Sequence, residues 1–220
     1  MKYCFYRMTH DTGFAPNPFH GYCTLAACTP NHKRANLNPG DIIVGYEGEV
    51  LKKRWKRSDC ETPEHNALIY YMVIDERLDH LDTYFHDPRF QAKKPIPGSR
   101  NPIYRVGDNA YYKDKSTGSW NWISGHRHNL DKGKDITKVI AQDTKGNRVF
   151  IGRNFYYFGN KAVPFPNRFK KHLPQRGIKY CRYPLPEFDR YVRKKAEELG
   201  GRQRRLGDPI EIRTVGGRSC

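Results

Sequence analysis

The most hydrophobic stretch of the chain is Ala67-Leu68-Ile69-Tyr70-Tyr71-Met72-Val73-Ile74. It combines β-branched and aromatic residues over a length that is short for a helix and typical of a buried central strand. A second β-branched run, residues 42–46, follows the turn at Pro39-Gly40-Asp41. We expect the two runs to pair, so the sequence predicts a fold built on a β-sheet.

Shorter segments surround this pair. Alternating residues predict a first strand over 2–8, and short apolar runs predict further strands at 107–112, 139–141, 148–151 and 210–213, with a buried aromatic run at 155–159. Apolar residues at helical spacing predict helices over 78–85 and 186–199. The fold class is therefore α+β, with a mixed sheet for which closure into a barrel is one arrangement.

Two segments divide the chain. Residues 91–104 are rich in Lys, Pro, Arg and Gly and predict a long basic loop. Pro164-Phe165-Pro166 begins a basic connector, so we expect a domain over 1–163 and a basic extension over 164–220 that contains helix 186–199. Pro186 suits the first turn of that helix, and Gly200-Gly201 suits its end.

The composition points to an anionic partner. The 220 residues contain 40 Lys+Arg and 23 Asp+Glu, which leaves a formal charge of +17. Such an excess repels itself unless a polyanion or solvent screens it, and nucleic acid is the leading partner, with an anionic membrane as the alternative. No apolar run has the roughly 18–20 residues of a transmembrane helix, and the start of the chain lacks the apolar core of a signal peptide. We expect a soluble, cytoplasmic protein without membrane contact.

The cysteines do not indicate a metal or a disulfide framework. Six of them are scattered without a C-x-x-C pair, so reduced thiols are expected. His20, Cys23, Cys28 and His32 have ligand types that suit zinc, but their spacing is unusual for a zinc finger or knuckle. We expect no metal site, and no motif indicates a cofactor.

Reactive side chains are concentrated in residues 10–28, directly after the first predicted strand. Gly13 and Gly21 permit positive φ, and Pro16 and Pro18 restrict the backbone, so we expect an ordered loop. An ordered loop rich in polar groups is either a site or a structural loop that caps its own backbone.

An enzymatic interpretation assigns catalytic roles within this loop. Cys23 or Cys28 is the nucleophile, and His20 or His10 lowers the pKa of the thiol or relays its proton. Asp11 then orients the imidazole, and Asn17 donates a hydrogen bond to the developing oxyanion.

A binding interpretation uses the same loop without a reactive thiol. Asp11 and Asn17 hydrogen-bond the edge of an extruded base, while Phe14, Trp120 or Trp122 stacks on it, unless these aromatic residues belong to the core. Lys and Arg residues from 52–57, 93–105 and 190–205 hold phosphates, and those from 52–57 lie on a solvated hairpin tip in the structural alternative. The phosphate-binding candidates are Arg34, Lys52, Lys53, Arg54, Lys56, Arg57, Arg193, Lys194, Arg204 and Arg205.

Several motifs resemble a known family. They are Asp11-x-Gly13-Phe14-Ala15-Pro16-Asn17-Pro18-Phe19-x-Gly21-x-Cys23-Thr24-Leu25-Ala26-x-Cys28-x-Pro30, Gly40-Asp41-x-Ile43-x-Gly45, Asp87-Pro88-Arg89-Phe90, Gly107-Asp108-Asn109-x-Tyr111 and Phe155-Tyr156-Tyr157-Phe158-Gly159. Over residues 1–160 the chain resembles the nucleotide modification associated domain proteins. The resemblance implies a role in DNA modification, with DNA and other DNA-modification enzymes as partners, and leaves the reaction undefined.

A second resemblance concerns the fold. A Gly-Asp turn that leads into a β-branched strand, followed by a second apolar strand and an acidic helix, is similar to the pseudouridine-synthase-associated (PUA), ASCH and EVE-type barrels. Such barrels bind RNA or modified DNA bases, which implies a barrel here.

These observations predict a nucleic-acid-binding protein that is associated with DNA modification and acts on or recognises a modified, extruded base. The alternative is a cysteine-dependent transferase or hydrolase that acts on a nucleobase or a free nucleotide. The sequence has no Walker loop, no G-x-G-x-x-G after a strand and no H-E-x-x-H, so the usual motifs of nucleotide and metalloprotease sites do not decide between them.

Overall fold

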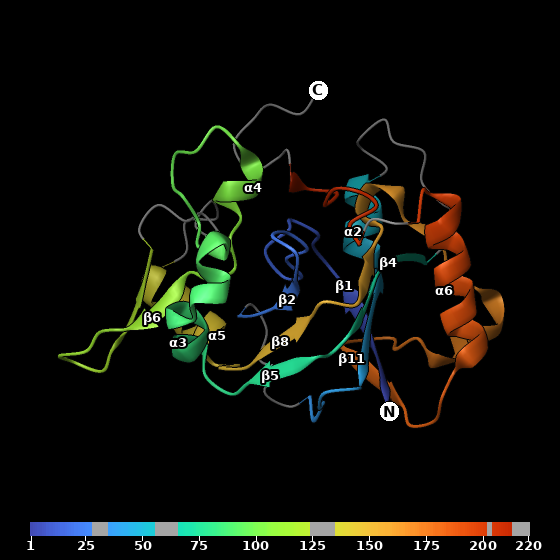
Figure 1. Ribbon diagram of the computed structural model, residues 1–220, viewed down its shortest axis with the longest axis horizontal. Coiled ribbons are helices and arrows are strands. Elements are labelled where there is room, and N and C mark those ends of the chain that lie inside the picture. Colours follow the sequence, from blue (N-terminus) through green and yellow to red (C-terminus); the bar gives the residue numbers. More distant parts are fainter. Residues whose placement is uncertain (28–34, 56–65, 124–134, 202–203, 213–220) are drawn as a thin grey trace.

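The computed structural model describes residues 1–27, 35–55, 66–123, 135–201 and 204–212 (Figure 1). Its central sheet contains six strands: β1 (Tyr3–Met8), β3 (Ile42–Glu47), β4 (Ala67–Val73), β9 (Phe155–Tyr157), β10 (Val163–Pro164) and β11 (Ile178–Cys181). The strand order is β10-β4-β3-β1-β11, and β9 also pairs with β4. Strands β1 and β3 are parallel and the other pairs are antiparallel, so the predicted mixed sheet is confirmed.

The predicted pairing of the two most hydrophobic runs is also confirmed. Strands β3 and β4 run antiparallel from Ile42↔Val73 to Gly45↔Tyr70. A Cβ atom on Gly45 would lie 1.9 Å from the ring of Tyr70, so only glycine allows this ring to cross the neighbouring strand. The glycine that interrupts the β-branched run therefore makes room for a core tyrosine.

A second sheet continues from the first through a bend. It contains β2 (Cys23–Leu25), β5 (Glu76–Leu78) and β8 (Val149–Gly152) in the order β2-β8-β5. Strands β4 and β5 pair with β9 and β8 in one register, from Tyr70↔Tyr157 to Leu78↔Val149. At the bend, a Cβ atom on Gly152 would lie 2.5 Å from the carbonyl oxygen of Val73. The two sheets are thus one bent ribbon, and close backbone approach at Gly152 permits the bend.

The sheets do not close into a barrel within the described residues, so the barrel expectation is wrong for this part of the chain. A separate hairpin of β6 (Tyr111–Lys113) and β7 (Trp120–Trp122) stands beside the second sheet.

The described helices are α2 (Glu49–Trp55), α3 (Leu81–His86), α4 (Pro102–Arg105), α5 (Ile136–Thr144), α6 (Pro186–Glu198) and the 3-10 helices η1 (Pro88–Lys93), η3 (Gly159–Lys161) and η4 (Asn167–His172). Helix α6 confirms the prediction for 186–199, and α3 confirms the later part of 78–85. Among the described helices, none is both long enough and apolar enough to cross a bilayer.

Four local predictions are wrong. Residues 139–141 lie in α5, because Asp135 caps the helix by accepting from the Thr137 N–H at 2.9 Å. The hairpin alternative for 52–57 fails because Lys52 to Trp55 end α2, which buries Leu51 and Trp55. The loop expected at 91–104 contains the end of η1 and the start of α4. Residues 210–212 form a turn, and position 213 lies outside the described residues.

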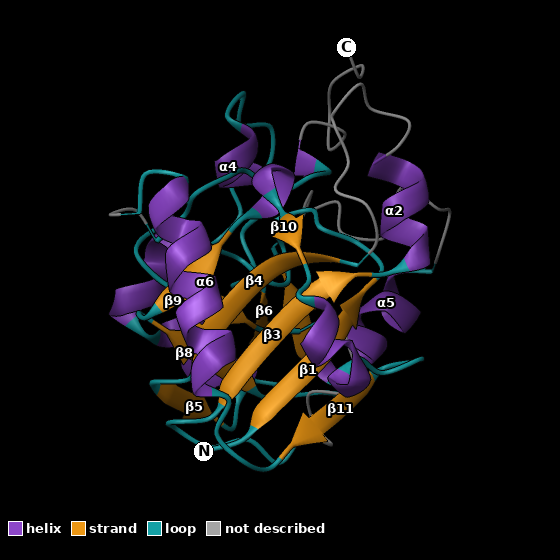
Figure 2. Cartoon of the chain, turned by 90° about the vertical axis from the view of Figure 1, so that its right-hand side faces the viewer, coloured by secondary structure: helices purple, strands orange, loops and turns teal. Residues whose placement is uncertain are grey.

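The C-terminal part of the chain completes the central sheet. The boundary expected after residue 163 falls inside β10, and β11 pairs with β1 from Tyr3↔Cys181 to Tyr6↔Ile178. Helix α6 packs on the sheet through Phe188, Val192 and Ala196 (Figure 2). A separate basic extension is therefore not confirmed.

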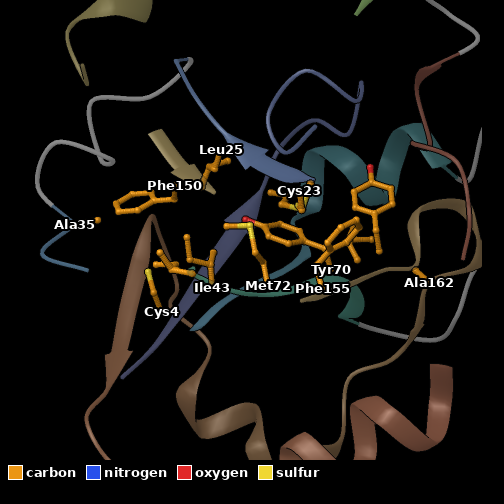
Figure 3. Close-up of a cluster of buried hydrophobic side chains, with 14 of the residues drawn as sticks. Cys4, Cys23, Leu25, Ala35, Ile43, Tyr70, Met72, Phe150, Phe155 and Ala162 are labelled. Carbon is orange, nitrogen blue, oxygen red and sulfur yellow. The ribbon is translucent and has the colours of Figure 1, made fainter. Parts of the chain in front are cut away.

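Alternation along the strands gives the central sheet two buried faces. One face, with Tyr3, Phe5 and Val44, packs against α6 and η4. The other face packs against the second sheet through Cys4, Ile43, Tyr70 and Met72, together with Cys23 and Leu25 of β2 (Figure 3). The loop that joins β1 to β2 lies on this second side, so the sheet itself provides the floor of the candidate site.

Candidate functional site

The loop that joins β1 to β2, which we call the site loop, ends in a tight turn over residues 17–22, which we call the site turn. Asn17 and Thr24 close it with two backbone hydrogen bonds, Asn17 N–H to Thr24 O at 2.8 Å and Thr24 N–H to Asn17 O at 3.0 Å. At its tip, His20 has φ +57° and Gly21 has φ +81°. The prediction of positive φ at Gly13 and Gly21 is confirmed, and the strained backbone at His20 is of the kind found at functional sites.

A buried lysine holds the site turn from below. The Lys93 ammonium donates to Asn17 O at 3.0 Å, to Asn17 Oδ1 at 2.8 Å and to Tyr22 O at 3.1 Å, and the side chain is 1% exposed. The Asn17 amide nitrogen donates to Val106 O at 3.2 Å. Asn17 thus has structural partners on both ends of its amide, and its side chain is 1% exposed, so it is not placed to donate to an oxyanion or a base of a ligand.

A buried carboxylate lies beside this lysine. Asp108 accepts from the Thr24 hydroxyl at 2.6 Å and from the Tyr84 hydroxyl at 2.8 Å. Burial raises the pKa of Asp108, while the charge of Lys93 and the two hydroxyl donors lower it. Next to it, a Cβ atom on Gly107 would lie 2.1 Å from the Lys93 carbonyl oxygen. The Gly107-Asp108-Asn109 motif therefore packs against the lysine that supports the turn.

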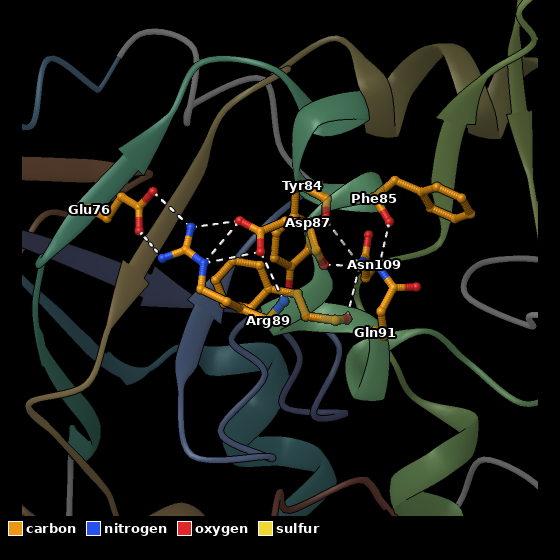
Figure 4. A network of polar contacts seen from close by, with 8 residues as sticks. Glu76, Tyr84, Phe85, Asp87, Arg89, Gln91 and Asn109 are labelled. Carbon is orange, nitrogen blue, oxygen red and sulfur yellow. Dashed lines mark hydrogen bonds and ion pairs between the residues drawn. The ribbon is translucent and has the colours of Figure 1, made fainter.

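The Asp87-Pro88-Arg89-Phe90 motif fixes the helix that carries Lys93 (Figure 4). Arg89 bridges Asp87 at 2.6 Å and Glu76 of β5 at 2.7 Å. Asp87 also caps η1 by accepting from the Arg89 N–H at 2.9 Å. The Asn109 amide donates to the carbonyls of Tyr84 and Phe90. These motif residues form a frame around the site rather than its chemistry.

A C-terminal segment, residues 204–212, closes the other side of the site, and we call it the strap. Asp11 accepts a short hydrogen bond from the Tyr157 hydroxyl and one from the Ile210 N–H at 3.0 Å. Its own N–H donates to Glu211 Oε2 at 2.8 Å. Burial raises the pKa of Asp11 to about 7, against the lowering effect of the Tyr157 and Ile210 bonds. Asp11 therefore holds the strap, and the orientation of an imidazole is not its role in this structure.

Glycines let the strap approach closely. Cβ atoms would lie 2.9 Å from Pro209 at Gly13, 2.1 Å from Asp208 O at Gly159, and 2.0 Å from Phe158 O at Gly207. The strap also pairs with β9 through a parallel bridge between Tyr157 and Arg205. His10 contacts Glu211 at 3.5 Å, and Arg54 of α2 forms a short ion pair with the same carboxylate.

The site turn, α4 and the strap enclose an open pocket of about 310 Å³. Its lining residues are Pro18, Phe19, His20, Gly21, Asn101, Ile103, Tyr104, Phe155, Arg204 and Arg205. The His20 imidazole stacks on the Tyr104 ring, with centroids 5.8 Å apart and planes 25° apart. The Arg205 guanidinium lies 5.1 Å above the Phe19 ring, and Arg204 donates to Gly21 O at 3.4 Å. The pocket thus combines flat aromatic surfaces with two cations.

The pKa of His20 is lowered by its burial and by the charges of Lys93 and Arg205. Its imidazole is therefore neutral at pH 7 and both stacks and exchanges hydrogen bonds without adding a charge. Tyr104 remains 42% exposed, which leaves one face of the stack open to a ligand.

Four residues that we predicted to act on a ligand lie in the core or beside it. Cys23 is completely buried, and burial raises the pKa of its thiol to about 12, so the thiol is neutral and inaccessible. Phe14 is 1% exposed and packs in a cluster that Trp120 and Trp122 flank from β7. Stacking of Phe14 on a ligand is incompatible with this packing, and the two tryptophans are half-buried outside the pocket lining.

The predicted cations are divided among three places. Lys52, Lys53 and Arg54 lie on α2, Arg193 and Lys194 face outward on α6, and Arg204 and Arg205 line the pocket. Cys28, Arg34, Lys56 and Arg57 lie outside the described residues, as do Cys60, His32, His126 and His128. The described residues contain no cluster of three or more His, Cys, Asp or Glu side chains that would hold a metal ion.

Sequence reasoning missed Tyr104 and the role of Lys93. Both fall in the stretch 91–104, whose Lys, Pro, Arg and Gly content predicted a long basic loop with phosphate-binding cations. That expectation is wrong for Lys93, which is 1% exposed and bonded to the site turn. The motif Gly107-Asp108-Asn109 could have indicated the role of Lys93. A carboxylate that is buried in a turn needs hydrogen-bond donors or a cation as partners, and a nearby lysine can supply them.

The fold and the site together define an α+β protein whose pocket is closed on one side by the strap and lined by aromatic and cationic side chains. The chain belongs to the nucleotide modification associated domain 2 family, whose model matches residues 1–215. This confirms the family resemblance and extends it beyond residue 160, so that the family match includes β11, α6 and the strap. Neither the curated proteins nor the solved structures contain a match to the chain.

Proposed function

We propose that the protein binds DNA in the course of nucleotide modification and recognises a single extruded, modified nucleotide in the pocket between the site turn, α4 and the strap. The family match supports a link to nucleotide modification. The observation that carries the proposal further is the pocket itself, in which the stacked His20 and Tyr104 rings lie beside Arg204 and Arg205.

The size and composition of the pocket suit one nucleotide. Small-molecule sites occupy roughly 300–1,000 Å³, and this pocket of about 310 Å³ is at the lower end of that range. A base has a π-face that stacks on an aromatic ring irrespective of sequence. Arginine offers a planar fork that matches a phosphate. Tyr104 therefore suits the base, and Arg204 and Arg205 suit the phosphate.

Extrusion follows from the walls of the pocket. The pocket is bounded by a turn, a helix and a strap, so a base has to leave the duplex in order to lie between them. The formal charge of +17 and the exposed Arg193 and Lys194 would contribute affinity for the phosphate backbone without sequence preference.

Recognition is favoured over chemistry that depends on Cys23. The nucleophile that the sequence offered first, Cys23, is buried in the core, and the pKa of its thiol is raised to about 12. Asp11 and Asn17, which would have assisted it, are bonded to the strap and to Lys93.

The test compares binding to a matched duplex, the same duplex with one mismatched pair, and the single strand, by fluorescence anisotropy. A mismatch lowers the cost of extrusion, so the wild-type protein should prefer the mismatched duplex and the single strand. Tyr104→Ala should weaken binding to these two probes about tenfold or more, since stacking on a base contributes roughly 1–3 kcal/mol. The control is Tyr183→Ala, which removes a tyrosine that is 53% exposed outside the pocket lining.

If Tyr104→Ala binds each probe with the same affinity as the wild-type protein, the pocket is not the recognition site. The double variant Arg193→Gln, Lys194→Gln should reduce the slope of affinity against salt by about two while the probe preference is kept. Mass spectrometry of the nucleosides after incubation should show no change of mass, and a changed mass would instead establish a reaction. The same probes with a modified base in place of the mismatch then measure selectivity for the modification.

A further inference from the structure

We propose that Lys93 is the positioning residue of the pocket: its charged, triply bonded ammonium holds the site turn in the form that presents His20 to the ligand. This inference rests on the proposed function of the pocket. It adds a regulation of that site, because the support depends on whether Lys93 carries its proton.

The contacts of Lys93 match the three protons of an ammonium group. Two of its acceptors, Asn17 O and Tyr22 O, are backbone carbonyls at the two ends of the site turn. The third is Asn17 Oδ1, which also accepts from the Phe19 N–H at 3.2 Å. One side chain therefore connects the start of the turn, its end and the backbone of a pocket residue.

Lys93 is itself held firmly. Its carbonyl oxygen accepts from the Asn109 N–H at 3.2 Å, and Gly107 packs directly against it. The helix η1 that carries Lys93 is fixed at its other end by Arg89, which bridges Asp87 and Glu76 (Figure 4). Lys93 is thus rigidly supported on one side and makes three hydrogen bonds on the other. The conformation of the site turn therefore depends on whether the Lys93 amine is protonated.

The charges around Lys93 come from several elements. Asp108, whose carboxylate Tyr84 and Thr24 also bond, and Cys23 of β2 raise the pKa of Lys93, and burial lowers it more strongly, to about 8. On the turn, the charge of Lys93 in return lowers the pKa of His20. Between pH 7 and pH 9 the charged fraction would fall from about nine tenths to about one tenth. If the neutral form does not hold the turn, affinity for the ligand falls about tenfold over this interval.

The stability of the protein should change in the opposite direction. The pKa of Lys93 is lower in the folded chain than the ordinary 10.5 of an exposed lysine, so the unfolded chain binds more protons above pH 8. The contribution of Lys93 to the free energy of unfolding therefore rises with pH just where ligand affinity falls. A lysine with a purely structural role would not separate these two quantities.

Lys93→Met tests the proposal, because methionine keeps much of the length and apolar stem and removes the charge and all three donors. The matched control is Lys94→Met at the next position, where the ammonium lies 3.7 Å above the Phe85 ring and makes none of the contacts of Lys93 with the site turn. The first measurement needs no ligand: NMR titration of the His20 ring in histidine-labelled protein, with the resonance assigned by His20→Gln.

In Lys93→Met the pKa of His20 should rise toward its ordinary value and the ring-current shift from Tyr104 should be lost, whereas Lys94→Met should match the wild-type protein. Affinity for the mismatched duplex should be about tenfold lower at pH 7 and should not vary from pH 7 to pH 9. An unchanged His20 in Lys93→Met would overturn the inference, whatever happens to DNA binding.

A displaced His20 with unchanged DNA affinity would support the positioning role and refute the proposed function of the pocket. If Lys93→Met does not fold, the wild-type protein decides. A fall of affinity between pH 7 and pH 9 that Lys94→Met, which retains Lys93, also shows, and that is accompanied by movement of the His20 resonance, supports the inference. A His20 resonance that remains constant over that interval overturns it.

Discussion

Replacing Asp11 with asparagine tests how the strap is held. The pKa of Asp11 is raised from 3.8 to about 7, chiefly by burial, because the carboxyl is completely enclosed between the site loop, Tyr157 and the strap. Well below pH 3.8 the group is protonated in both the folded and the unfolded chain and has no effect on the pH dependence. As the pH rises to 7, the unfolded chain ionises first, so the free energy of unfolding falls. The full loss is about 4 kcal/mol, of which about 3 kcal/mol falls between pH 4 and pH 7.

Asparagine keeps one oxygen for the Ile210 N–H and offers an amide to the Tyr157 hydroxyl, but it cannot ionise. Urea unfolding of both proteins at half-unit steps from pH 4 to pH 7.5 measures the difference. The free energy of unfolding of the wild-type protein should fall relative to that of Asp11→Asn by about 3 kcal/mol over this interval. The control is Asp114→Asn: hydrogen bonds from Ser116 and Thr117 hold the pKa of this exposed carboxyl at about 2, so its contribution is lost only as the pH falls below the interval. Parallel curves for the wild-type protein and Asp11→Asn would refute the account of the buried carboxyl.

Two further changes test the packing. Gly207→Ala should destabilise the protein by roughly 2 kcal/mol or more and lower the thermal midpoint, because the new methyl group would lie 2.0 Å from Phe158 O in a segment that Asp11 already fixes. A thermal midpoint equal to that of the wild-type protein would show that the strap can shift to accommodate the methyl group without loss of stability. Cys23→Ala should cost about 1 kcal/mol in urea unfolding, since a small apolar group leaves the core, and should leave DNA affinity unchanged. Loss of binding or activity in a folded Cys23→Ala protein would show that the Cys23 thiol takes part in function.

The strands could be predicted from the sequence because their apolar content exceeds every competing signal. The runs at 42–46 and 67–74 and the loop that leaves the first strand were predicted correctly, as was the helix at 186–199. Residues 139–141 were not, because three apolar residues resemble a strand until the Asp135 cap and the bond from the Tyr111 hydroxyl to Asp143 at 2.6 Å are known. Barrel closure depends on the edge pairing of distant strands, which local patterns do not encode.

The predicted site residues include part of the lining of the candidate pocket. The loop at 10–28 does contain His20 and Gly21 of the pocket, and Arg204 and Arg205 were among the predicted phosphate contacts. The roles within the loop were not predictable, because a polar side chain such as Asp11 or Asn17 has the same chemistry whether its partner is a ligand or the backbone of a distant segment. Lys93 and Tyr104 become site residues only through contacts over many tens of positions in the chain.

The two walls of the pocket come from opposite ends of the described chain, since Gly21 and Arg204 are 183 positions apart. A site assembled in this way exists only when the whole protein is folded, and no partly open form that releases the strap would retain it. By mass action, a nucleotide at about a hundred times its dissociation constant would then add roughly 3 kcal/mol to the global unfolding free energy. Differential scanning calorimetry with a panel of nucleotides would thus rank ligands by the rise in the thermal midpoint of unfolding, before the modified base is known.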